Sequence, residues 1–134
     1  MAKITRALHT GISVYNMDES VEWYEKNLDF KKIKDDYVPP LKARIVFLSN
    51  GEYELELFQY DQPKPLPKDR LMPNDDLQTV GTKHVAFEVD DMAGMKEKFL
   101  ANGVEIAHEV QMEGNNVMFI HDNSGVLIEL IQNN

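Results

Sequence analysis

The chain of 134 residues is long enough for one domain, or for two very small units that share a core, and 43% of its residues are apolar. No apolar run suits a transmembrane helix or a signal peptide, so we expect a cytoplasmic protein with no membrane partner. The net charge of −9, with lysines and arginines scattered singly, argues against nucleic acid as a partner, because phosphate binding needs a clustered basic face.

The first half of the chain predicts a strand, a helix and three further strands. Residues 4–14 alternate as a strand does, and Met17-Asp18-Glu19-Ser20 opens a helix with an acidic first turn. The apolar stripe of that helix is predicted at Val21, Trp23, Tyr24 and Leu28. Strands are predicted at 31–37, 43–49 and 52–60, with Asn50-Gly51 as a type I′ hairpin turn between the last two.

The stretch 61–81 holds four of the six prolines, which indicates a linker or surface loop rather than a regular element. The order of the first half then repeats. We expect a strand at 82–90, a helix at 91–102 and three strands at 104–110, 115–121 and 125–132. The prediction is an α+β fold of two tandem βαβββ modules, about 4–60 and 82–132, within one domain that spans residues 1–134.

The repeat places one histidine and one glutamate at matching positions of each half. His9 and His84 begin the first strand of each half, and Glu56 and Glu129 lie in LELF and IELI on the last strands. The histidines are 75 residues apart and the glutamates 73. A lone carboxylate in an apolar strand is costly to bury unless a cation balances it. His108 and His121 lack this symmetry. We expect His108 to be exposed. His121 begins the turn before the last strand, from which it could line the mouth of a cup between the modules.

These four side chains predict a divalent-metal site. Side chains two apart in a strand share a face, so the first and last strands of each module can project into a cup between the two sheets. Because the chain has no cysteine, the ligands are nitrogen and oxygen atoms. Two nitrogens and two oxygens are compatible with one Zn, Ni, Mn, Co or Fe ion per site, and they do not choose among these metals.

The segments LHTGISV, SVEWYEKNLDF, KHVAFEVDD and GVLIELI resemble the vicinal oxygen chelate superfamily, from about Ile4 to Gln132. That superfamily includes glyoxalase I, methylmalonyl-CoA epimerase, fosfomycin-resistance enzymes and extradiol dioxygenases. The resemblance implies that His9, Glu56, His84 and Glu129 are the metal ligands of a glyoxalase I-like site. It also implies that a ligand glutamate moves a proton between adjacent carbons through an enediolate. Bleomycin-binding relatives generally lack these ligands.

The chain also departs from each named relative. Ser13 and Tyr60 stand where glyoxalase I has an arginine and an asparagine that contact glutathione, so the glutathione contacts are not matched. The second half is similar to methylmalonyl-CoA epimerase, whose histidine falls on His121, but ARIVFLS lacks the second carboxylate of some epimerases. Lys42 and Arg44 lie there instead, either solvated or able to anchor a carboxylate or phosphate.

The sequence therefore predicts a divalent-metal-dependent isomerase or lyase that acts next to a carbonyl, with Glu129 first and Glu56 second as the proton-transferring residue. The expected partner is a small molecule with vicinal oxygens, and the resemblance implies a homodimer. Two alternatives stay open. One is a methylmalonyl-CoA epimerase-like epimerase, and the other is a non-catalytic ligand-binding or resistance protein.

Overall fold

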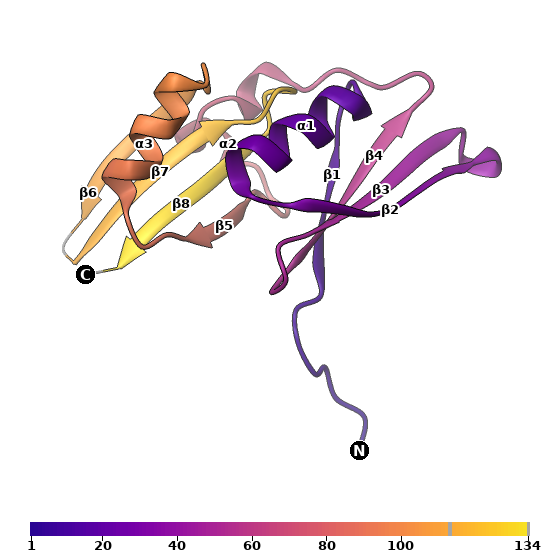
Figure 1. The fold of residues 1–134 in the computed structure, drawn as a ribbon, viewed down its shortest axis with the longest axis horizontal. Coiled ribbons are helices and arrows are strands. Elements are labelled where there is room, and N and C mark those ends of the chain that lie inside the picture. Colours follow the sequence, from indigo (N-terminus) through magenta and orange to yellow (C-terminus); the bar gives the residue numbers. More distant parts are fainter. Residues whose placement is uncertain (113, 134) are drawn as a thin grey trace. The chain divides into compact units, whose positions relative to one another are not determined.

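The computed structural model describes residues 1–112 and 114–133, which fall into two compact units, Met1–Pro63 and Lys64–Asn134. The first unit contains β1 (His9–Ser13), α1 (Met17–Leu28), β2 (Lys31–Val38), a 3₁₀ turn at Pro39–Leu41, β3 (Ala43–Ser49) and β4 (Glu54–Tyr60). The second contains a 3₁₀ turn at Lys68–Arg70, α2 (Pro73–Asp76), β5 (Val85–Glu88), α3 (Met92–Ala101), β6 (Ile106–Met112), β7 (Asn115–His121) and β8 (Leu127–Asn133). Figure 1 labels the elements. The tandem βαβββ prediction is confirmed.

Each unit folds into one four-stranded mixed sheet of the same topology. The strand order is β1-β4-β3-β2 in the first and β5-β8-β7-β6 in the second. The first strand of each unit pairs in parallel with the last, and the other pairs are antiparallel. The first and last strands of a unit therefore lie side by side. This adjacency allows a histidine of the first strand to reach a glutamate of the last.

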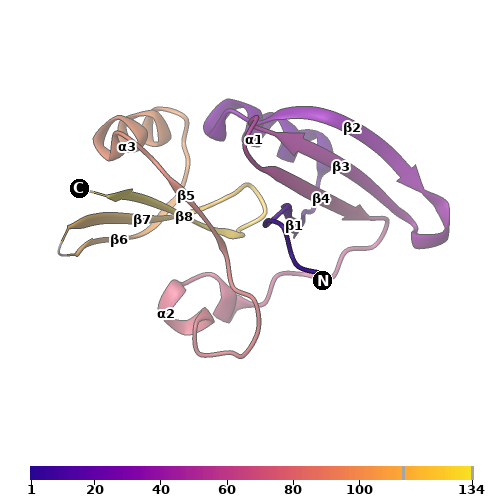
Figure 2. The ribbon, with the colours of Figure 1, turned by 90° about the horizontal axis from the view of Figure 1, so that it is seen from below.

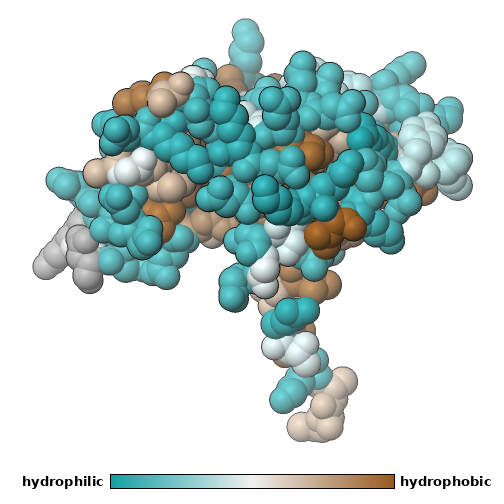
Figure 3. Space-filling view, in the orientation of Figure 1, coloured by the Kyte–Doolittle hydropathy of each residue, from teal (hydrophilic) through white to brown (hydrophobic). Residues whose placement is uncertain are grey.

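One face of each sheet is covered by the helix of its unit (Figures 1 and 2). Alternate strand residues are buried against the helices and form the core; they include Ile12, Val46, Leu48, Leu55 and Leu57 in the first unit and Met118, Ile120, Ile128 and Leu130 in the second. The outer faces of α1 and α3 are mostly hydrophilic (Figure 3). No helix in the described part of the chain is long and apolar enough to cross a membrane.

The buried face of α1 differs from the predicted apolar stripe. Its fully buried side chains recur every three or four residues, at Met17, Ser20, Tyr24 and Asn27. Val21, Trp23 and Leu28, which the periodicity assigns to the stripe, are only partly buried. Two of the four buried side chains are polar. A pattern built from apolar residues alone therefore predicts a face that is rotated about the helix axis relative to the face that is buried.

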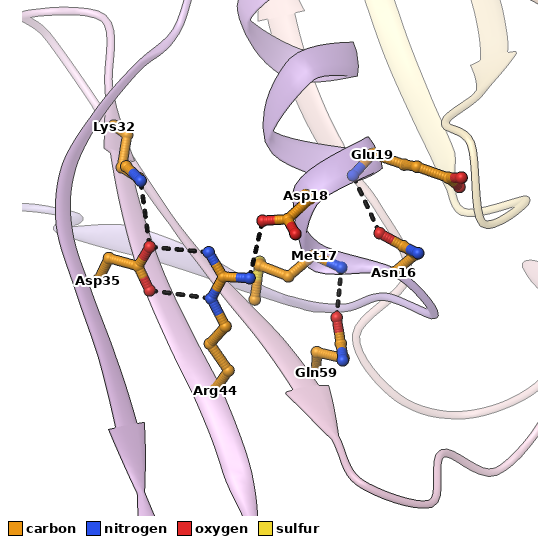
Figure 4. A network of polar contacts seen from close by, with 8 residues as sticks. All are labelled: Asn16, Met17, Asp18, Glu19, Lys32, Asp35, Arg44 and Gln59. Carbon is orange, nitrogen blue, oxygen red and sulfur yellow. Dashed lines mark hydrogen bonds and ion pairs between the residues drawn. The ribbon is translucent and has the colours of Figure 1, made fainter.

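The N-terminus of each helix is attached to the last strand of its unit by equivalent contacts. Asn16 and Asp91 cap the two helices by accepting from the N–H groups of Glu19 and Gly94, both at 3.0 Å. The Gln132 side chain accepts from the backbone N–H of Met92 at 2.6 Å, and Gln59 accepts from Met17 in the same way. Figure 4 shows the contacts in the first unit. The glutamines are spaced as the glutamates are.

The last hairpin of each unit turns on a side-chain acceptor rather than on the predicted type I′ geometry. The Oδ1 atom of Asn50 accepts from the N–H groups of Glu52 and Tyr53, at 2.9 and 2.8 Å. Asp122 accepts likewise from Ser124 and Val126, at 2.8 and 2.9 Å. Gly51 has a positive φ of 94° but Asn50 does not, whereas type I′ requires it at both positions. The hairpin is where the sequence predicts it, and the type I′ assignment is wrong.

Most strand and helix bounds lie within three residues of the sequence predictions, and two regions differ by more. β1 begins at His9 rather than near Ile4, and all eight preceding residues are exposed and extend away from the sheet (Figure 1). The stretch 61–81 contains a 3₁₀ turn and α2, although its prolines indicated an irregular linker. Pro73 occupies the first turn of α2, where the missing N–H has no cost, so proline starts a helix here.

Arg44 connects the edge of the first sheet to α1 (Figure 4). Its guanidinium donates to both carboxylate oxygens of Asp35, at 2.9 and 2.8 Å, and to Asp18 at 2.8 Å. Lys32 adds a fourth contact, 3.1 Å from Asp35. These cations lower the pKa of Asp35 from 3.8 to about 2, mainly through the hydrogen bonds from Arg44. Arg44 is therefore committed to joining two strands and a helix.

We expect Asp35→Asn to lower the unfolding free energy at pH 7 by about 1 kcal/mol. The lowered pKa corresponds to at most about 2.5 kcal/mol, which partial solvent exposure reduces. Because the folded-state pKa lies below the unfolded one, this stabilisation is present above about pH 4 and is lost as the pH falls towards 2. Urea unfolding at pH 7, 5, 4 and 3 measures the difference between wild type and variant. Asp36→Asn is the matched control, because Asp36 contacts Lys34 only at 3.8 Å. Equal pH dependence of both variants would contradict the assignment.

Candidate metal centre

The helix-free face of the first sheet brings His9 and Glu56 together. His9 begins β1 and Glu56 lies at the middle of the neighbouring β4, between Leu55 and Leu57, which point to the core. The Nε2 atom of His9 is 3.2 Å from the Oε1 atom of Glu56, and the two side chains are 33% and 20% exposed. We call these residues the first pair. Both donor atoms are partly open to solvent and face the side of the sheet away from α1.

The second unit repeats this arrangement with His84 and Glu129. His84 immediately precedes β5, and Glu129 lies in β8 between the buried Ile128 and Leu130. The Nε2 atom of His84 is again 3.2 Å from the carboxylate Oε1 atom, and the side chains are 15% and 18% exposed. We call these residues the second pair. Its histidine is about half as exposed as the histidine of the first pair.

An aromatic ring supports the histidine of each pair. The ring of Phe47 on β3 lies edge to face against the His9 ring, with 5.8 Å between the ring centroids. The ring of Phe119 on β7 lies in the same way against the His84 ring, with 5.0 Å between the centroids. Phe47 pairs with Glu56 in the strand register, and Phe119 pairs with Glu129. Each site half is thus the same arrangement of a histidine at the start of the first strand, a glutamate on the last strand and a phenylalanine on the strand next to it.

The geometry of each pair fits two ligands of one divalent ion. Ligands that each bind an ion at about 2.1 Å lie about 3.0 Å apart at right angles and about 3.4 Å apart in a tetrahedron. The observed separation of 3.2 Å falls between these values in both units. Imidazole nitrogen with carboxylate oxygen is a donor set that suits Zn, Ni, Mn, Co or Fe. The residues present therefore fit the predicted cofactor.

Each unit brings together two of the four predicted ligands. In the described ranges, 1–112 and 114–133, no three histidine, aspartate or glutamate side chains form a ready-made metal cluster. The structure confirms that His9 lies beside Glu56 and that His84 lies beside Glu129. The joining of the two pairs around one ion stays a prediction. Glu54, which is spaced to share the face of Glu56, is half-buried on an inner strand.

The other two histidines stand apart from the pairs. His108 on β6 is exposed, as predicted. His121 is 8% exposed, and both of its ring nitrogens are engaged: Nδ1 lies 2.7 Å from Glu105 Oε1, and Nε2 lies 2.6 Å from the carbonyl oxygen of Leu71. His121 therefore joins the segment before α2 to the second sheet. Its nitrogens are not free to bind a metal or substrate in this arrangement.

The basic side chains considered as anion anchors are not on the helix-free faces. Arg44 lies on the face that bears α1, within its contacts to Asp35 and Asp18, and Lys42 is exposed in a positive-φ turn after the Pro39–Leu41 helix. The strands of the second sheet contain no lysine or arginine. Arg44 therefore serves the fold, and its side chain is not available to a ligand.

Comparison with known proteins identifies relatives over nearly the whole chain. Residues 6–130 match the family described as Glyoxalase/Bleomycin resistance protein/Dioxygenase superfamily. Over 133 residues the chain is 29% identical to a lactoylglutathione lyase of Escherichia coli O157:H7, which covers 95% of this chain and 92% of the relative.

Solved structures share the fold. A glyoxalase family protein of Enterococcus faecalis aligns with a TM-score of 0.79 at 23% identity, covering 94% of this chain and 96% of that one. The trypanothione-dependent glyoxalase I of Leishmania major aligns with a TM-score of 0.76 at 27% identity, covering 96% and 87%. The activities in these names are those of the relatives.

Proposed function

Because the chain belongs to the glyoxalase/bleomycin resistance protein/dioxygenase superfamily, we propose that its two histidine–glutamate pairs hold one divalent metal ion and that the protein is an isomerase or lyase acting next to a carbonyl. The observation that carries the proposal is the equal 3.2 Å contact in both units, each with its edge-to-face phenylalanine. Two such pairs supply the four protein ligands, from one chain or from two chains of a homodimer.

The glutamates of the pairs are placed to move a proton. When bound, the ion would act as a Lewis acid on two neighbouring oxygens of the substrate. The carboxylate of Glu129 takes the proton from the carbon beside the carbonyl and returns it to the adjacent carbon. Ile128 and Leu130, both buried, hold the Glu129 strand in place while its carboxylate stays 18% exposed and reachable. Glu56 is the second candidate, since its surroundings in β4 are equivalent.

The histidines and phenylalanines orient this chemistry rather than perform it. The edge-to-face contacts hold each imidazole so that Nε2 points at the carboxylate of its pair. Apolar side chains surround the second pair: Val117, Phe119 and Leu127 form a buried cluster against which Ile131 packs. Such an apolar wall limits the access of water to a reactive intermediate.

Charge distribution indicates what the rest of the substrate is like. Within the strands of the two sheets, lysine and arginine occur only on β2 and β3, at Lys31, Lys32, Lys34 and Arg44. Arg44 and Lys32 bind Asp35, and Lys34 lies 3.8 Å from Asp36. With a net charge of −9, the protein offers little attraction for a carboxylate-bearing tail. We propose that a hemithioacetal substrate would be bound through its carbonyl end and apolar contacts, not through the carboxylates of glutathione.

Purified without chelator, the protein is expected to hold about one transition-metal ion per site, as measured by elemental analysis. His9→Ala and His84→Ala should each lose most of this metal, because each removes one of four ligands. His108→Ala is the control, since His108 is exposed and lies outside both pairs. Absence of metal from the wild type, even after addition of Ni, Zn, Mn or Co, would overturn the proposal and leave a ligand-binding role.

Glu129→Gln is expected to lower kcat at least about 100-fold with methylglyoxal hemithioacetals, because the amide cannot accept the proton. Exchange of the substrate C–H proton with deuterated solvent, followed by NMR, should fall in parallel. Glu88→Gln on β5 is a control of equal size, because Glu88 bonds Asn133 and belongs to neither pair. Unchanged turnover in Glu129→Gln would show that another group moves the proton.

A thiol series separates the metal chemistry from glutathione recognition. We expect the methylglyoxal adduct of glutathione diethyl ester to be converted with a kcat/KM at least equal to that of the glutathione adduct, because no described strand cation faces the carboxylates. Raising the salt concentration should bring the kcat/KM values of the two adducts closer together, because salt screens the net negative charge of the protein. A preference of more than about tenfold for free glutathione would contradict the charge argument while leaving the metal proposal intact.

A further inference from the structure

A charge cluster around one buried carboxylate lies in the segment that leads into His84. Asp76, at the end of α2, is 2% exposed, and its carboxylate Oδ1 atom is 3.2 Å from Arg70 Nε and 3.4 Å from Lys83 Nζ. We call Arg70, Asp76 and Lys83 the Asp76 cluster. It is not a contact between neighbours in sequence, because 13 residues separate Arg70 from Lys83. The cluster closes the segment 70–83 into a loop.

Backbone contacts within the Asp76 cluster hold the peptide that precedes His84. Arg70 Nη2 donates to the carbonyl oxygen of Lys83 at 3.2 Å, while its Nε bonds Asp76. Lys83 Nζ also donates to the backbone carbonyl oxygen of Asp76 at 2.8 Å. The carbonyl of Lys83 belongs to the peptide bond that leads directly to the His84 nitrogen. Arg70 thus connects a buried carboxylate to the backbone of a predicted metal ligand.

The same segment is attached to the second sheet, so the cluster is not a free loop. Leu71, next to Arg70, accepts from the His121 ring at 2.6 Å. A Cβ on Gly125 would come within 3.2 Å of both Leu66 and Leu71, which shows how closely this segment packs on the turn before β8. Figure 2 shows α2 on the side of the second sheet opposite α3. The sheet therefore supports the cluster, and the cluster supports the entry to β5.

The first unit has no counterpart. Residues 1–8, which precede His9, are all exposed and leave the sheet as an extended segment (Figure 1). The His9 side chain is 33% exposed, against 15% for His84. The two pairs therefore share their distances and ring contacts but differ in what holds their histidines.

The composition of the cluster indicates positioning rather than simple stabilisation. Asp76 Oδ2 is buried and has no hydrogen-bond partner among the described residues, so this carboxylate is only partly satisfied. A buried ion pair generally contributes little net stability compared with apolar residues of similar size. The ion pair instead orients the groups that it contacts, because a guanidinium donates its hydrogen bonds in a fixed plane.

We propose that Asp76 is a positioning residue for the metal centre. Through Arg70 and Lys83 it fixes the backbone at His84, so that the second pair is ordered before the metal arrives. The proposal rests on the proposed metal-binding function and assigns Asp76 no contact with metal or substrate. Groups outside the ligand shell that orient a ligand affect metal affinity strongly.

Asp76→Asn is the test, with Asp75→Asn as its matched control, since Asp75 precedes it in α2 and is exposed. We expect Asp76→Asn to raise the metal dissociation constant about 10- to 100-fold, measured by chelator competition, and Asp75→Asn to leave it unchanged. In metal-free protein, hydrogen exchange of the peptide containing residues 83–85 should be faster in Asp76→Asn only. Equal affinity in Asp76→Asn and wild type would overturn the positioning role.

Two further outcomes are decisive. If Asp76→Asn does not fold by circular dichroism, Arg70→Lys replaces it, because Arg70 is 40% exposed and lysine has a single nitrogen in place of the two, Nε and Nη2, that Arg70 uses for Asp76 and for the Lys83 carbonyl. A folded Arg70→Lys variant with unchanged metal affinity would overturn the proposal. If the wild type binds no metal, the proposed function fails and the role of Asp76 in metal binding fails with it. Faster exchange at 83–85 in the variant would then establish the cluster as a backbone support alone.

Discussion

The alternation of side chains across each four-stranded sheet is the constraint on which the rest of the structure depends. A single helix covers one face, where the middle of the inner strands contributes alternate apolar, buried residues, and the residues between them face away from the helix. His9, Glu56 and Phe47 occupy that second face in one unit, and His84, Glu129 and Phe119 occupy it in the other. The chain can present reactive groups there because the core is complete without them.

Duplication extends well beyond the candidate ligands. The helix caps, the glutamines that hold the helix N-termini and the turns built on Asn50 and Asp122 all recur in both units. These contacts fix the position of the first and last strands relative to the helix within each unit. Because the predicted ligands lie on or directly beside those two strands, the structural repeat also reproduces the geometry of the histidine–glutamate pair.

The two units differ in the contacts that hold their histidines and in the charged residues of their strands. The first unit uses Arg44 to join β2, β3 and α1, and its His9 follows an exposed N-terminal segment. The second unit has no cationic strand residue, and its His84 follows a segment held by Asp76. Cations in both units bind carboxylates of the protein itself. These contacts leave Arg44, Arg70 and Lys83 committed to the fold.

The sequence by itself determined the order of the strands and of α1 and α3, the bounds of β3 and β7, and the membership of both pairs, because strand periodicity and internal duplication are local or repeated signals. Tertiary structure alone decided the buried face of α1, the partners of Arg44, the engagement of His121 and the Asp76 cluster. Each of these depends on polar side chains that meet across many residues. Neither hydrophobic pattern nor spacing distinguishes a charge that is solvated from one that is buried against a distant partner, since only the folded chain determines which opposite charge lies within reach.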